Sequence, residues 1–380
     1  MGGCREQNQD NLFNVDRVEP TKGAFNEKTR QVYGHGCAPG NDVTCVMDAE
    51  GKTVLETTVA TEAGTLLRLM EGINGPLHVT FEEGTQAGWL YEVVRGYAKE
   101  VIVCDPRRNR LLEEGSKGDK PDARKLAQLL RAGLLRSVYH GHEEATRKLK
   151  QLVRAYENLS DDTQRTMVRI KAVYRSRGIA CRGQEAYQPT QRKQWLEKLS
   201  EPGARQRMEW LYEELDQLAP LRRRAKQAVI REGGKHRAVA LLRTIPQVGP
   251  LRSALIVATV DTPHRFRTKR QLWSYSGLAV VTHMSSEYQI QEDRVIGSRK
   301  PIATRGLNRN CNHRMKDVFI GAATGGAQIE PYRTYLERLE QTGMRAEMAR
   351  LTLARKIAAV ALSIWKKGEV FDPKKLNWTT

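Results

Sequence analysis

The sequence has little cysteine, few aromatic residues and no long hydrophobic stretch. Its six cysteines are scattered over 380 residues, with no Cys-x2-Cys pair and no histidine at ligand spacing, which argues against a zinc site or a disulfide framework. No uncharged apolar run approaches the roughly 18 to 20 residues of a membrane-spanning helix, which excludes an integral membrane protein. The first residues lack the apolar segment of a secretory signal, so we expect a cytoplasmic protein with reduced thiols.

Acidic residues are outnumbered by basic ones. The chain has 63 Lys and Arg against 44 Asp and Glu, a formal net charge of +19, and its isoelectric point is about 9.8. Such an excess is typical of soluble proteins that bind a polyanion, and nucleic acid is the first candidate. The length is sufficient for two or three domains, each with a buried core.

Residue patterns divide the chain into four predicted regions. Residues 1–30 are polar and aperiodic, which indicates a poorly ordered extension. Residues 31–142 alternate between strand and helix patterns and predict a compact α/β domain. Residues 143–240 have a helical period, and residues 241–376 predict a mostly helical C-terminal domain. The fold class is therefore α/β plus all-α.

Within the α/β region the patterns predict four strands and three helices. The strands are expected at 43–47, 53–59, 77–81 and 101–104, and the helices at 63–71, 88–97 and 122–132. A turn at 48–51 joins the first two strands into a hairpin.

In region 143–240 apolar residues recur at spacings of three and four among dense charges. Two interpretations remain open. One is a pair of antiparallel helices with solvated faces, and the other is a coiled-coil arm that dimerises. A break at 178–189 interrupts the helical pattern.

Residues 241–257 read as an apolar helix end, a tight Pro/Gly turn and a second apolar helix. This pattern predicts a helix-hairpin-helix whose exposed backbone amides, at Val248, Gly249 and on to Leu251, bind a phosphate. A purely structural helical turn is the alternative.

Further along, basic residues gather in a stretch with almost no acids after Asp293. They are Arg294, Arg299, Lys300, Arg305, Arg309, Arg314 and Lys316, with Asn308, Asn310 and Asn312 interleaved. The cluster suits contacts to a nucleic-acid backbone, and a solvated charged face is the alternative.

Acidic residues at two places in the α/β region are candidate metal ligands. Glu82 and Glu83 follow a predicted strand, at the end where α/β folds place their sites. Asp119 and Asp122 are three apart at a helix start and so share one face of the helix. Hard carboxylates in this arrangement suit Mg2+, whereas capping of the helix is the alternative role for the two aspartates.

Six short stretches are weak evidence of a family singly but specific evidence together. In chain order they are Phe81-Glu-Glu-Gly-Thr-Gln-Ala-Gly-Trp-Leu-Tyr91, Val103-Cys-Asp-Pro-Arg-Arg-Asn109, Gly118-Asp-Lys-Pro-Asp-Ala-Arg-Lys-Leu-Ala127, Thr244-Ile-Pro-Gln-Val-Gly-Pro250, Phe266-Arg-Thr-Lys-Arg-Gln-Leu-Trp-Ser-Tyr-Ser-Gly-Leu278 and Arg305-Gly-Leu-Asn-Arg-Asn310. With these, the chain from about Val43 to Leu376 resembles the DEDD-type insertion-sequence transposases. Relatives of that family include the pilin-gene invertases and the bridge-RNA-guided recombinases.

The resemblance implies an RNase-H-like, RuvC-type domain, a coiled-coil insertion and a C-terminal transposase domain with a nucleophilic serine. The family's second acid falls on Glu82, and its third and fourth fall on Asp119 and Asp122, which would bind Mg2+. The serine falls on Ser285, with Ser286 as the alternative. Attack of such a serine on a DNA phosphodiester leaves a phosphoserine and a free 3′-hydroxyl, so rejoining needs no outside energy.

Position 36 departs from the family pattern. In the run Tyr33-Gly-His-Gly-Cys-Ala-Pro-Gly-Asn41 the first acid is replaced by Gly36, which supplies no metal ligand. Asp42 is the nearest substitute, at a different position of the turn or strand. A second hypothesis is that residues 1–42 are translated out of the ancestral frame, because codons for this run permit Met-Asp-Val-His-Gln-Ala-Thr-Met one base later. The nucleotide sequence of the gene decides between them.

We therefore expect a transposase of a bacterial insertion sequence that cuts and rejoins double-stranded DNA at the element ends and the target. The resemblance also implies an element-encoded guide RNA and a dimer or tetramer. Two alternatives stay open. One is a catalytically inactive or frameshifted relative that only binds DNA or RNA, and the other is a junction nuclease that uses the RuvC-type domain without the serine.

Overall fold

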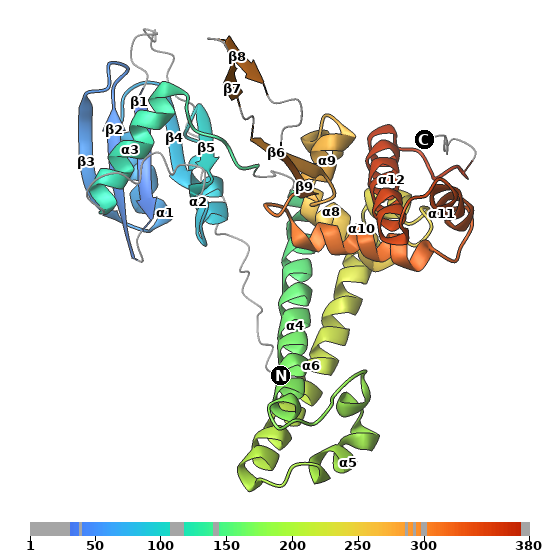
Figure 1. The fold of residues 1–380 in the computed structure, drawn as a ribbon. Helices are drawn as coiled ribbons and strands as arrows, with labels where there is room; N and C mark the ends of the chain where they lie inside the picture. The colour runs from blue at the N-terminus through green and yellow to red at the C-terminus, as the bar shows by residue number, and fades with distance from the viewer. Residues whose placement is uncertain are drawn as a thin grey trace, which may run out of the picture. The chain divides into compact units, whose positions relative to one another are not determined.

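The computed structural model describes residues 31–37, 40–106, 118–139, 144–285, 288–291, 294–297 and 302–373 (Figure 1). The chain forms two compact units, one through residue 140 and the other from residue 141. It is mostly helical with small sheets, as expected for an RNase-H-like domain followed by a helical one. The predicted extension 1–30 lies outside the described residues.

The first unit contains a five-stranded sheet with the order β3-β2-β1-β4-β5. The strands are β1 Gln31–Cys37, β2 Asn41–Met47, β3 Thr53–Ala60, β4 Leu77–Glu82 and β5 Glu100–Cys104. β1, β2 and β3 are antiparallel neighbours, whereas β1, β4 and β5 run parallel. The carboxyl ends of β1 and β4 therefore lie at the same edge of the sheet.

Helices cover both faces of this sheet (Figure 1). They are α1 Ala63–Glu71, α2 Ala87–Val94 and α3 Asp119–Ala132. Val79 and Phe81 of β4 pack with α1 and α2, whereas Val43 and Cys45 of β2 pack with α3. Because neighbouring side chains of a strand point to opposite faces, these two cores assign the residues of β2 to β5 to the α1/α2 face or to the α3 face.

The four predicted strands are confirmed and become β2 to β5. The three helices are confirmed as well, although α3 begins at Asp119 rather than at residue 122, and α2 ends at Val94. The central strand β1 was not predicted, because its sequence QVYGHGC lacks a strand pattern. It forms because β2 and β4 offer it hydrogen-bonding partners on both sides.

The second unit begins with two long antiparallel helices, α4 Glu144–Arg175 and α6 Pro202–Gly233 (Figure 1). The connection between them carries the short α5 Arg192–Glu197, and it packs around Tyr174, Trp195 and Met208 as a separate small core. The predicted antiparallel pair and the break after residue 178 are confirmed. Dimerisation through this arm stays a prediction.

Six more α-helices lie in the described part of the second unit. They are α7 Arg237–Leu242, α8 Pro250–Val260, α9 Lys269–Tyr275, α10 His313–Gly326, α11 Tyr332–Gln341 and α12 Ala346–Lys367. They share one hydrophobic core with the ends of α4 and α6, through residues such as Leu149, Val153 and Val229. The predicted boundary at residue 240 therefore falls inside a continuous core, and it stays a prediction.

Two small antiparallel ribbons lie between α9 and α10. One pairs β6 Val280–Ser285 with β9 Ile302–Leu307, and the other pairs β7 Tyr288–Gln291 with β8 Arg294–Gly297. These strands were not predicted.

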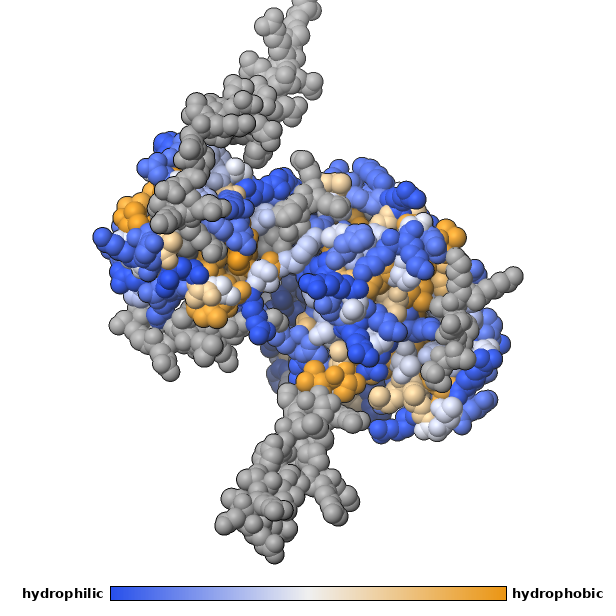
Figure 2. Space-filling view, turned by 90° about the horizontal axis from the view of Figure 1, so that it is seen from above, coloured by the Kyte–Doolittle hydropathy of each residue, from blue (hydrophilic) through white to orange (hydrophobic). Residues whose placement is uncertain are grey.

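Hydrophilic residues cover much of the visible surface of each unit, and the hydrophobic ones lie in separate small patches (Figure 2). Cys45, Cys104, Cys181 and Cys311 are free thiols. Over the described residues, we find no helix with both the length and the apolar composition to cross a membrane.

Candidate functional site

Strand register places Glu82 next to position 36 at one edge of the sheet. His35 pairs with Phe81 in the parallel ladder between β1 and β4, so Gly36 lies beside Glu82. Gly36 also pairs with Val43 of β2. Since Val43 belongs to the α3 face and Glu82 alternates with Phe81, position 36 and Glu82 share the α3 face.

The start of α3 brings two more carboxylates to this face. Asp119 and Asp122 lie in its first turn, and both are exposed. Lys125, one turn later, lies 4.0 Å from Asp122. The unpaired amides of a helix N-terminus favour negative charge, so this position suits carboxylates whether or not they bind a metal. No capping hydrogen bond comes from Gly118, the residue before the helix.

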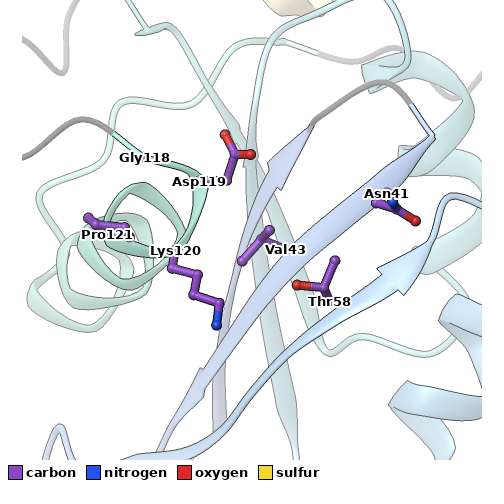
Figure 3. Close-up of a pocket in the computed structure, with 7 residues that line it drawn as sticks. All are labelled: Asn41, Val43, Thr58, Gly118, Asp119, Lys120 and Pro121. Carbon is purple, nitrogen blue, oxygen red and sulfur yellow. The ribbon is translucent and has the colours of Figure 1, made fainter.

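A pocket of about 530 Å³ lies at the start of α3 (Figure 3). Its lining comes from β2, β3 and the first turn of α3, through Asn41, Val43, Thr58, Gly118, Asp119, Lys120 and Pro121. In Figure 3 the side chain of Lys120 extends from the helix alongside the strands. The predicted acid Asp119 thus lines a concave site together with a cation.

Asp42 does not face this pocket. It alternates with Val43 along β2, so it belongs to the α1/α2 face, and its side chain is fully buried. The suggestion that Asp42 substitutes for the missing acid is therefore wrong. A carboxylate on the far side of the sheet cannot share a cation with Asp119.

The donor chemistry on the α3 face suits a divalent cation, but the set is incomplete. Glu82, Asp119 and Asp122 offer hard oxygen ligands, whereas Gly36 offers none. Among the residues that the structure describes, no three His, Cys, Asp or Glu side chains lie close enough to hold a metal ion. The three carboxylates share a face without converging on a point.

The predicted nucleophile lies in the second unit, at the end of a strand. Ser285 is the last residue of β6, where it pairs with Ile302 of β9. Ser286 lies outside the described residues. Of the basic candidates, Arg305 lies on β9 opposite Thr282, and Arg294 opens β8. Arg299 and Lys300 lie outside the described residues.

The predicted helix-hairpin-helix is present as α7, a tight turn and α8, but one of its amides is occupied. Val248 is buried, and its amide donates to the carbonyl of Ile245 at 3.0 Å. The expectation that Val248 presents a free amide is therefore wrong. Gly249 is exposed and immediately precedes α8, so its backbone remains a candidate phosphate contact.

The asparagines after Arg305 have structural roles. Asn312 caps α10, with its side chain accepting from the amide of Met315 at 3.0 Å. The amide group of Asn308 donates to the carbonyls of Ser274 and Asn310. Arg314 forms an ion pair with Asp161 of α4. These groups bind the protein itself, so Asn308 and Asn312 have structural roles, and their contact with nucleic acid stays a prediction.

Two of the short stretches from the sequence analysis contact each other in the second unit. The stretch 266–278 contains Ser274, and the stretch 305–310 contains Asn308, so the hydrogen bond between them joins distant segments at the base of the β6–β9 ribbon. The backbone of Asn308 adds a second link, because its amide donates to the carbonyl of Ala279 at 3.0 Å. The ribbon that ends in Ser285 is thereby tied to α9.

Comparisons with known proteins cover both units. A DEDD-type transposase family model of the IS110 elements matches residues 37–176, from the last residue of β1 into the segment just after α4. A second model, described as Transposase IS116/IS110/IS902 family, matches residues 239–332, from α7 to the start of α11. A search of curated proteins found no match. The two models describe the same family, match in the expected order and include the segments that contain Glu82, Asp119 and Ser285. The chain belongs to the IS110/IS116/IS902 family of transposases.

Proposed function

We propose that this transposase cuts and rejoins double-stranded DNA with Ser285 as the nucleophile and with Glu82, Asp119 and Asp122 as its acids. The observation that supports this most is the shared α3 face, because the end of β4 and the start of α3 bring distant acids to one side of the sheet. In this proposal the first unit is a RuvC-type domain, and the second unit combines a coiled-coil insertion with the transposase domain.

The proposed reaction conserves the phosphodiester energy. The Oγ atom of Ser285 bonds to phosphorus while the bond from phosphorus to the 3′ oxygen breaks. The serine proton is released, and the leaving oxygen takes up a proton to become a 3′-hydroxyl. Attack by the 3′-hydroxyl of another strand on the phosphoserine reverses these changes and joins the new ends.

The acids have a separate role at the phosphate. Mg2+ held by Glu82, Asp119 and Asp122 would stabilise the negative charge that develops there. Lys120, which lines the same pocket as Asp119, adds a positive charge of the chain itself.

Binding of nucleic acid is assigned to the remaining candidates. In this proposal the backbone of Gly249 and the side chains of Arg294, Arg299, Lys300 and Arg305 contact phosphates. We extend it to an element-encoded guide RNA, because base pairing then supplies the sequence specificity. The active form is a dimer or tetramer.

The test is a covalent protein–DNA adduct. The purified chain is incubated with its element-junction DNA, candidate flanking RNA and Mg2+, and a serine-linked adduct is sought on a denaturing gel. We expect Ser285→Ala and Asp119→Ala to abolish the adduct. Two controls, Ser363→Ala on the exposed side of α12 and Glu71→Gln at the end of α1, should retain it.

Other outcomes contradict the proposal in distinct ways. Cleavage that survives Ser285→Ala identifies a junction nuclease that uses the first unit alone. An adduct on Ser286 in the Ser285→Ala variant assigns the nucleophile to Ser286. If only a Gly36→Asp variant forms the adduct, this chain is an inactive binder descended from an active enzyme.

A further inference from the structure

Two segments of the second unit contain no acidic residue. They are 262–286, which includes α9, and 348–368, which covers most of α12. Together they contain nine basic residues, namely Arg265, Arg267, Lys269, Arg270, Arg350, Arg355, Lys356, Lys366 and Lys367. This imbalance is local, because the chain as a whole contains 44 acids.

The two segments pack against each other. The Nζ atom of Lys366 donates to the carbonyls of Phe266 and Arg267, at 2.5 and 3.2 Å. The indole of Trp273 donates to the carbonyl of Arg355 at 2.9 Å. Figure 1 shows α9 and α12 as neighbours in the same unit. The charges of the α9 segment therefore lie beside those of Arg355, Lys356 and Lys366, whereas Arg350 lines a separate pocket with Glu337 and Glu340.

Four of these cations have no carboxylate partner in the part of the chain that the structure describes. Within the described residues, no carboxylate forms an ion pair with Arg267, Lys269, Arg270 or Arg355. Burial lowers the pKa of Lys356, and the neighbouring charge of Lys269 lowers it further. Like charges held close together are unfavourable in the free protein, and an anionic partner relieves that repulsion.

The aromatic rings beside this surface are already occupied. The guanidinium of Arg265 lies 4.5 Å from the ring centre of Tyr275. The Nζ atom of Lys269 lies 5.6 Å from the ring centre of Trp273, whose indole nitrogen is hydrogen-bonded. Single-stranded nucleic acid is bound by stacking bases on open aromatic faces, so this arrangement favours contacts to the backbone of a duplex.

We propose that the α9–α12 basic surface, defined by Arg267, Lys269 and Arg270 at the start of α9, where it packs against α12, binds the phosphate backbone of duplex DNA. The surface adjoins the base of the β6–β9 ribbon, because Arg355 donates from Nε to the carbonyl of Leu278 at 2.6 Å, two residues before β6. DNA bound there lies next to the ribbon that ends in Ser285. The identification of that DNA as substrate rests on the proposed function.

The experiment removes three exposed charges at once. In Arg267→Gln, Lys269→Gln, Arg270→Gln only side chains change, and the hydrogen bonds that Arg267 makes to Gln271 and Lys366 use its backbone. The matched control removes three exposed charges from the arm, as Arg182→Gln, Lys193→Gln, Arg207→Gln. Binding of a fluorescent 30-base-pair duplex is measured by anisotropy over a series of salt concentrations.

We expect the surface variant to bind more weakly, because fewer phosphates are neutralised. The slope of the logarithm of the binding constant against the logarithm of the salt concentration should fall by about one unit for each phosphate that no longer has a cation. The control should keep the slope of the parent chain. Equal slopes for the two triple variants would overturn the proposal. So would a weakening confined to an RNA of the same length, since that would identify RNA as the occupant.

The experiment distinguishes a loss of DNA binding from a loss of folding and from a failure of the proposed chemistry. Thermal melting of each variant checks the fold, and Lys269→Glu alone replaces the triple variant if the latter melts early. It should still reduce the slope. Anisotropy requires no cleavage. If the surface variant has a reduced slope but the parent chain forms no adduct, the basic surface is supported and the proposed chemistry is contradicted. If the surface variant has an unchanged slope and the parent chain forms the adduct, the chemistry is supported and the surface is contradicted.

Discussion

The side-chain amide of Asn308 donates to the backbone carbonyl of Ser274 at 3.1 Å, across 34 residues of sequence. The same side chain donates to the carbonyl of Asn310 and accepts from its amide, at 2.9 and 3.0 Å. One residue thus ties the end of β9 to α9, at the base of the ribbon that ends in Ser285.

Replacing Asn308 should destabilise the second unit. Asn308→Ala removes the hydrogen bonds of a half-buried side chain to Ser274 and Asn310, at a cost of about 1 to 3 kcal/mol. Urea unfolding measures this cost. Asn310→Ala is the control, because Asn310 is exposed and its bonds to Asn308 use the backbone, so a change within about 0.5 kcal/mol is expected. Equal costs for the two variants would contradict the role of Asn308.

Gly277 should tolerate no side chain. Its φ angle is +64°, and a Cβ atom there would lie 2.5 Å from the Sγ atom of Cys311. Gly277→Ala therefore combines a backbone cost of about 1 to 2 kcal/mol with a steric clash.

Gly178→Ala separates the two costs in the Gly277 experiment. Gly178 has a similar φ of +71° with no atom within 4 Å of the added Cβ, so only the backbone cost applies. The free energy of unfolding should fall further for Gly277→Ala than for Gly178→Ala. Adding Cys311→Ala to Gly277→Ala should recover part of the difference, and no recovery would contradict the clash.

Asp216 should make the stability of the arm depend on pH. Its carboxylate accepts two hydrogen bonds from Arg192, at 2.6 and 2.7 Å, and these bonds and the positive charge hold its pKa below the ordinary value of 3.8. A carboxylate with a lowered pKa stabilises the fold above its unfolded-state pKa, and this contribution is lost as the pH falls through the folded-state pKa.

Asp216→Asn should therefore be less stable than the parent chain at pH 7, and the difference should shrink as the pH falls below about 4. The midpoints of urea unfolding between pH 7 and pH 2 measure this difference in stability. Glu197→Gln, on the exposed side of α5, is the control and should show a smaller difference at pH 7. A difference for Asp216→Asn that stays constant to pH 2 would show that the charge of Asp216 is not its cause.

Gly36→Asp should strengthen binding of divalent cations. The new carboxylate lies on the α3 face beside Glu82, where the chain lacks a ligand. Mg2+ should raise the melting temperature of this variant more than that of the parent chain, since a ligand at 100 times its Kd stabilises by about 2.7 kcal/mol. Gly36→Asn, without the charge, is the control. An equal Mg2+ effect on all three proteins would show that position 36 does not reach the acids.

The positions of Glu82 and Asp119 in secondary structure were predictable because their signals are local. Alternation identified β4 before Glu82, and charge at a helix start identified α3. Position 36 was different, because β1 has no pattern of its own and exists through hydrogen bonds to β2 and β4. The exclusion of Asp42 also required the sheet, since only packed helices define which face of a strand is which.

The sequence by itself determined the basic character of this transposase, its α/β and helical regions, and the family motifs, because charge, periodicity and short motifs are properties of neighbouring residues. The tertiary structure decided which acids share a face, which amides are occupied and which cations of the described residues lack counter-charges. Val248, Asn308 and Arg314 show the reason. Each was a candidate partner for nucleic acid, and each is bound to a group of the protein that only folding brings close.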